Sequence, residues 1–132
     1  MKKAYVRCGI VCCMVLLAIC SVGCNKTPPY TVYDFDVSTC AWGLEHFPVD
    51  DHVGEIPDAE TAVKQAKQLW VKYLSQAGEQ SYNPINGLPV TVGFDAERAC
   101  WCVSGTLQDG VDGAVPRAVI QQDGTVLAVW ME

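Results

Sequence analysis

The chain has 132 residues, half of them hydrophobic, and its 15 acidic residues against nine basic ones give a net charge of −6. This length supports one domain built around one hydrophobic core. The acidity argues against nucleic acid as a partner, because binding phosphates requires lysine and arginine. The same charge permits a basic protein partner through complementary fields, or serves only to keep the protein soluble.

Residues 1–23 form a segment of their own. Lys2, Lys3 and Arg7 precede an apolar run over residues 9–22, and small residues lead to Cys24. This arrangement resembles a bacterial lipoprotein signal peptide. The resemblance implies cleavage before Cys24 and acylation of its thiol with palmitate, which anchors the protein in the cell envelope on the periplasmic or outer-membrane face. An uncleaved membrane anchor is the alternative, although the run is shorter than the roughly 20 residues of a spanning helix.

Residues 24–52 are predicted to be a tether and a poorly defined arm. Polar and apolar residues alternate from Tyr30 to Val37, a pattern that fits either a short strand or an extended arm. Trp42 to His52 has mixed polarity and contains a proline, so we predict a loop there. Asp50, Asp51 and His52 have the chemistry of metal ligands, but a solvated acidic loop is the favoured interpretation and we assign no metal site.

The clearest helical signal runs from Asp58 to Gln76. Apolar residues recur there every three or four positions, as on a helix with one buried face. Asp58 is expected to cap the start of the helix, and Gly78 is expected to end it. The apolar face consists of Ala62, Val63, Ala66, Leu69, Trp70, Tyr73 and Leu74.

Four strands are expected after this helix. Leu88–Phe94 and Ala99–Leu107 alternate in polarity and are separated by a polar turn. Val115–Gln121 and Thr125–Met131 are joined by Asp123-Gly124, a pair that accepts the positive φ of a tight hairpin. One helix followed by hairpins predicts an α+β fold, in which one main helix packs on a curved antiparallel sheet of about four strands.

Three cysteines remain after Cys24, namely Cys40, Cys100 and Cys102. Cys100 and Cys102 are two positions apart on a predicted strand, so they share a face and cannot easily bond to each other. Either one could pair with Cys40 in an oxidising compartment. A C-x-C pair alone is too little for a zinc site, and no cofactor is expected.

Four segments carry recognisable motifs: Val53–Ala62 (VGEIPDAETA), Cys100–Leu107 (CWCVSGTL), Gly113–Ile120 (GAVPRAVI) and Asp123–Leu127 (DGTVL). Together they resemble the nuclear transport factor 2 fold immunity proteins of bacterial polymorphic toxin systems. The resemblance covers residues 53–132, which we take as an immunity-like domain, and implies a cystatin-like or nuclear transport factor 2-like cone. It also implies a small protein that blocks a toxin without catalysis. Cysteines flank Trp101 where the family has aliphatic residues.

We therefore expect a non-enzymatic, lipid-anchored immunity or inhibitor protein that neutralises a cognate basic toxin. The sequence shows no nucleophile–base pair and no phosphate-binding loop that would indicate an enzyme. Acidic residues in two predicted turns are the expected contacts with the toxin: Asp95, Glu97, Asp109 and Asp112.

Two other functions remain open. In the first, the cone encloses a pocket for a small ligand or a reaction, lined by Tyr73, Trp101 and Trp130. We favour the interpretation that these three aromatic residues fill the core. In the second, the protein is a surface lipoprotein with a structural or adhesive role.

Overall fold

The computed structural model describes residues 30–74, 88–107 and 109–132. The described elements are, in chain order, β1 (Val32–Asp34), the 3-10 helix η1 (Val37–Cys40), α1 (Ala41–His46), β2 (Pro48–His52), α2 (Ala59–Leu74), β3 (Val90–Asp95), β4 (Cys100–Gly105), β5 (Pro116–Gln121) and β6 (Thr125–Met131). The α+β class is confirmed. Within the described part of the chain, however, the sheet has six strands and is mixed, and there are two α-helices where one main helix was expected.

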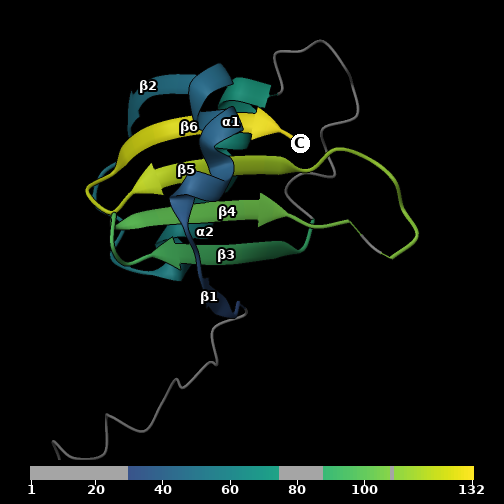
Figure 1. Ribbon diagram of the computed structural model, residues 1–132, viewed down its shortest axis with the longest axis horizontal. Helices are drawn as coiled ribbons and strands as arrows, with labels where there is room; N and C mark the ends of the chain where they lie inside the picture. Colours follow the sequence, from purple (N-terminus) through teal and green to yellow (C-terminus); the bar gives the residue numbers. More distant parts are fainter. Residues whose placement is uncertain (1–29, 75–87, 108) are drawn as a thin grey trace, which may run out of the picture.

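The strands form one sheet in the order β1-β3-β4-β5-β6-β2 (Figure 1). The four strands after α2 make an antiparallel meander, as predicted. Its last turn contains Gly124 at a φ of +97°, and the Gly124 amide donates to the carbonyl of Gln121 at 2.9 Å. The N-terminal part of the chain supplies both edges of the sheet: β1 pairs parallel with β3, and β2 pairs antiparallel with β6.

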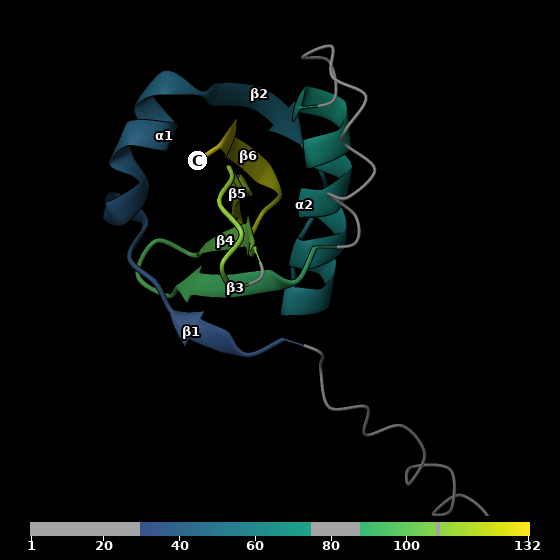
Figure 2. The same ribbon diagram turned by 90° about the vertical axis from the view of Figure 1, so that its right-hand side faces the viewer.

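Helix α2 covers one face of the sheet (Figure 2). Its first turn is capped by Asp58, whose Oδ1 accepts the backbone N–H of Thr61 at 2.8 Å, so the predicted cap is confirmed. The expected end at Gly78 lies outside the described residues. The predicted apolar face is also confirmed. Its buried helix residues are Ala62, Val63, Ala66, Leu69 and Trp70.

The opposite face of the sheet is covered by η1 and α1 (Figure 2). The prediction of a loop from Trp42 to His52 is therefore wrong, because this stretch contains helix α1 and strand β2. Helix α1 is six residues long and depends on its contact with the sheet, since a helix this short is not stable alone. The absence of a side chain at Gly43 lets α1 lie close to the sheet, because a Cβ at this position would be 2.5 Å from the ring of Trp130.

Strand β2 is fastened to α2 by polar contacts. Asp51 accepts hydrogen bonds from Lys72 Nζ at 2.7 Å and from the Tyr73 hydroxyl at 2.8 Å. These two donors lower the pKa of Asp51 to about 2, with the Lys72 bond as the larger cause. Asp51, one of the three residues with metal-ligand chemistry, therefore already binds two side chains of α2.

Candidate protein-binding surface

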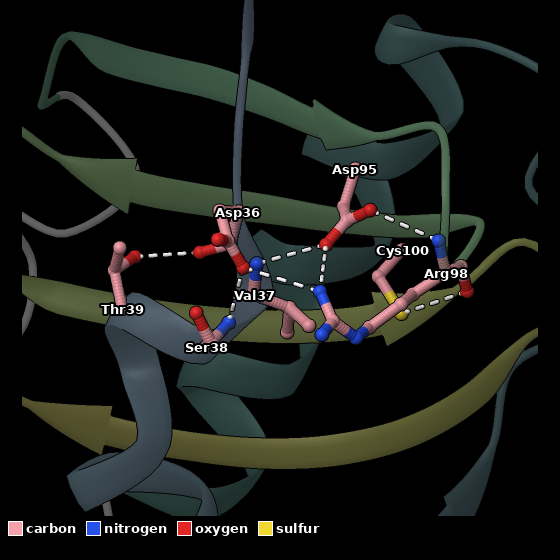
Figure 3. A network of polar contacts seen from close by, with 7 residues as sticks. All are labelled: Asp36, Val37, Ser38, Thr39, Asp95, Arg98 and Cys100. Atoms are coloured by element: carbon pink, nitrogen blue, oxygen red, sulfur yellow. Dashed lines mark hydrogen bonds and ion pairs between the residues drawn. The ribbon is translucent and has the colours of Figure 1, made fainter.

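The predicted contact residue Asp95 is buried. Only 3% of it is exposed, and its carboxylate accepts the backbone N–H groups of Val37 and Arg98, each at 2.9 Å (Figure 3). Arg98 Nη1 lies 3.3 Å from the same carboxylate. The backbone hydrogen bonds hold the pKa of Asp95 below its ordinary value. Asp95 therefore fastens η1 to the turn between β3 and β4, and we remove it from the expected contact set.

The other three predicted contacts are exposed but do not form one site. Glu97 lies in the turn that precedes β4, whereas Asp109 and Asp112 lie in the connection that follows it. The six residues of β4 separate these two ends by about 20 Å, at roughly 3.4 Å per residue. Figure 1 shows the turn and the long connection at opposite ends of the strand. A single compact partner site cannot be centred on all three carboxylates.

An exposed aromatic cluster lies on α1, where the sequence analysis placed no site. Trp42 is 57% exposed and Phe47 is 41% exposed. The Trp42 ring stacks on His46 with centroids 5.0 Å apart, and it meets Phe47 edge-on at 5.3 Å. We call these three residues the α1 aromatic cluster. The four-residue spacing of Trp42 and His46 was a helical signal that the mixed polarity of the stretch obscured.

The α1 aromatic cluster is held in place by the fold. Nδ1 of His46 lies 2.8 Å from the carbonyl oxygen of Trp42, one helical turn earlier. The Phe47 amide donates to the Gly43 carbonyl at 2.9 Å, and the Phe47 carbonyl accepts the amide of Val129 from strand β6 at 3.3 Å. The rings are therefore presented on a backbone fixed to the sheet, which reduces the entropy lost on binding.

Charge is divided between the two helical layers. Helix α2 carries Glu60 and three lysines, Lys64, Lys67 and Lys72, of which Lys72 pairs with Asp51. On the η1–α1 side, Arg98 pairs with two carboxylates and Arg117 pairs with Glu132. The exposed carboxylates of Glu45 on α1 and Asp50 on β2 belong to the same two elements that frame the aromatic cluster. These two elements thus carry exposed acidic residues.

The aromatic residues considered for a ligand pocket do not share a cavity. Trp101 is packed in the core on the α2 side of the sheet, and its Nε1 donates to the carbonyl of Ile56 at 3.1 Å. Trp130 is packed in the core on the η1–α1 side. The sheet itself lies between them. Tyr73 is partly buried, with its hydroxyl bonded to Asp51.

The open depressions of the described surface include the following two. One, of about 440 Å³, is lined by Glu55, Pro57, Ala99, Gln122 and Asp123. The other, of about 240 Å³, is lined by residues around the Asp95–Arg98 ion pair, where the charged groups already bind one another. The first depression has no aromatic residue in its lining, whereas the second combines Phe35 and Phe94 with several carboxylates.

Cys40, Cys100 and Cys102 are all buried free thiols. Among the described residues, no group of three or more histidine, cysteine or acidic side chains is arranged to hold a metal ion. Cys24, the predicted acylation site, lies outside the described part of the chain. Within that part, every helix is too short or too polar to span a bilayer.

No protein-family model, curated protein or solved structure matches this chain.

Proposed function

We propose that this chain is an immunity or inhibitor protein that binds a basic protein toxin through the α1 aromatic cluster and blocks it without performing chemistry. The exposure of Trp42 and Phe47 on a fixed backbone carries the proposal. Tryptophan is enriched among the residues that dominate binding energy at protein interfaces. The exposed Glu45 and Asp50 and the net charge of −6 favour a basic partner, and disfavour both an anionic membrane surface and a second copy of this acidic chain.

The resemblance of residues 53–132 to nuclear transport factor 2 fold immunity proteins supports the same function. We propose that α2 and the meander β3–β6 correspond to the helix and curved sheet of that cone. The packing of α2 across β3 to β6 is consistent with this correspondence. The additional strands β1 and β2 and the helix α1 precede or border the region of resemblance.

Envelope location is part of the proposal. A lipid on Cys24 would hold the protein at the membrane and leave the described domain free to meet an incoming toxin. Metabolic labelling with a palmitate analogue tests this directly: label is expected on the wild-type protein and is expected to be lost in Cys24→Ala. Label retained by Cys24→Ala would contradict the assignment.

Co-expression with the product of a neighbouring toxin gene tests the function. Cells that produce the toxin are expected to survive with the wild-type protein and to die with Trp42→Ala. Val71→Ala is the matched control, since Val71 is 46% exposed but belongs to α2 on the other side of the sheet. Failure of the wild-type protein to protect, with both proteins produced and folded, would contradict the proposal.

A small-ligand protein is the alternative function. It gains no support from the tryptophans, which lie on opposite faces of the sheet. It would require binding at an open depression of the surface, such as the two described above.

A further inference from the structure

Two of the three thiols lie next to each other beneath the η1–α1 layer. Cys40 ends η1, and Cys102 is in the middle of β4. Both belong to the same buried cluster, where they are 3% and 0% exposed. Each thiol changes the acidity of the other: the pKa of Cys40 is lowered and that of Cys102 is raised.

The surroundings of the pair favour the thiolate of Cys40. Arg117 Nη1 lies 3.8 Å from Cys40 Sγ and brings a positive charge to it. Arg117 is on β5, directly opposite Ser104 of β4, and the Ser104 hydroxyl lies 3.9 Å from Cys102 Sγ. A cation and a polar hydroxyl thus border the two sulfur atoms. A thiolate is the species that attacks a disulfide.

Cys100 is not part of this arrangement. Its Sγ donates to the carbonyl of Arg98 at 3.3 Å, at the end of β4 near the turn. Burial raises the pKa of the Cys100 thiol, and the negative charge of Asp95 raises it further. Two residues along a strand separate Cys100 from Cys102 by about 7 Å, so a cysteine beside one is not in bonding position for the other.

We propose that Cys40 and Cys102 form a disulfide bond, through exchange with a disulfide oxidant, that fastens η1 and α1 to the sheet. While η1 is open, the thiolate of Cys102 attacks one sulfur of oxidised glutathione and expels a glutathione thiolate. As η1 closes and brings Cys40 beside Arg117, the Cys40 thiolate attacks the Cys102 sulfur of the mixed disulfide and releases the second glutathione thiolate. Two S–H bonds are replaced by one S–S bond, and both electrons and both protons end on two glutathione thiols.

The bond would close a loop of about 60 residues and would restrict the unfolded chain accordingly. Because both sulfur atoms are buried, the attack on glutathione is expected during folding, before η1 closes over Cys102, and the second step is expected as η1 closes. The proposal concerns the cysteines alone and does not depend on toxin binding.

Peptide mapping of the full chain tests the assignment. The protein is refolded with oxidised glutathione or with a reducing agent, its remaining thiols are alkylated, and it is digested without reduction. After oxidation we expect a linked pair of peptides containing Cys40 and Cys102, with Cys100 alkylated. Cys100→Ala is the matched control and is expected to keep the link.

The melting temperature provides the second readout. Reduction is expected to lower it by about 10 °C in the wild-type protein and in Cys100→Ala, and to leave Cys102→Ala unchanged. If Cys102→Ala does not fold, the peptide map of the wild-type protein decides alone. Alkylation of both Cys40 and Cys102 after oxidation would overturn the proposal, and so would a link from Cys40 to Cys100.

Discussion

The two faces of the sheet are covered by helices that do different things. Helix α2 is 16 residues long, buries a continuous stripe and turns lysines toward solvent. Helix α1 has six residues, buries Gly43 and leaves Trp42 exposed. The α2 layer therefore provides most of the buried apolar area, whereas the η1–α1 layer is thin and presents aromatic rings. The α2 side of the sheet therefore contributes most to the stability of the fold, and the η1–α1 side carries the proposed binding surface.

The largest expected difference in stability is between alanine variants of two tryptophans, one from each layer. Trp70→Ala removes a fully buried ring from the α2 core and is expected to cost about 3–5 kcal/mol. Trp42→Ala removes an exposed ring and is expected to change stability by no more than about 0.5 kcal/mol. Urea unfolding measures both. Equal losses would contradict the assignment of stability to the α2 layer.

The close contact between α1 and the sheet predicts an intermediate effect. Gly43→Ala places a methyl group against the ring of Trp130 and is expected to cost about 1–3 kcal/mol through overpacking. The better helix propensity of alanine offsets up to about 1 kcal/mol of this loss. Glu45→Ala, on the exposed side of the same helix, is the control. A stabilised Gly43→Ala variant in the urea titration would show that α1 is not seated on Trp130.

The attachment of η1 through Asp95 predicts a smaller, pH-dependent effect. The pKa of this carboxyl is lowered in the folded protein, chiefly by the backbone N–H groups of Val37 and Arg98. Its contribution to stability is therefore present above the ordinary value of 3.8 and is lost as the pH falls through the lower, folded value. Melting temperatures from pH 7 to pH 2 are expected to fall less steeply for Asp95→Asn than for the wild-type protein. Parallel curves would contradict this role.

The α2 layer and the meander could be predicted from the sequence because their signals are local. Sixteen residues with a helical period, and strands with a period of two, record their buried face in the order of residues. The Asp123-Gly124 turn fixes its hairpin by backbone conformation. These elements match the predicted ranges to within three residues at the ends that the structure describes.

Residues 30–52 could be predicted only in part, because their elements depend on distant partners: a short strand within Tyr30–Val37 was one of two interpretations and is β1, whereas η1, α1 and β2 were not predicted. Helix α1 is too short to form alone, and β1 has three residues that pair in parallel with β3, some 60 positions later. The acidic strand β2 exists through its pairing with β6. Nothing within residues 30–52 indicates the surfaces that these elements contact.

The sequence could not distinguish Asp95 from Glu97 for a related reason. An aspartate at a turn has the same sequence signature whether its carboxylate binds the backbone or a partner protein. Asp95 binds the backbone of Val37 and Arg98, whereas Glu97, two positions later, is exposed. Sequence could identify the turn, but only the position of η1 distinguishes the two carboxylates.

The most direct test of the division between the two layers is calorimetric titration of the folded protein with a neighbouring basic toxin, using Trp42→Ala and Val71→Ala. Trp42→Ala is expected to raise the Kd about 30-fold or more, as for a central interface residue, with its melting temperature unchanged. Val71→Ala, on the α2 layer, is expected to leave the Kd within about twofold of the wild-type value. An unchanged Kd for Trp42→Ala, or a larger loss for Val71→Ala, would contradict the assignment of binding to the η1–α1 layer.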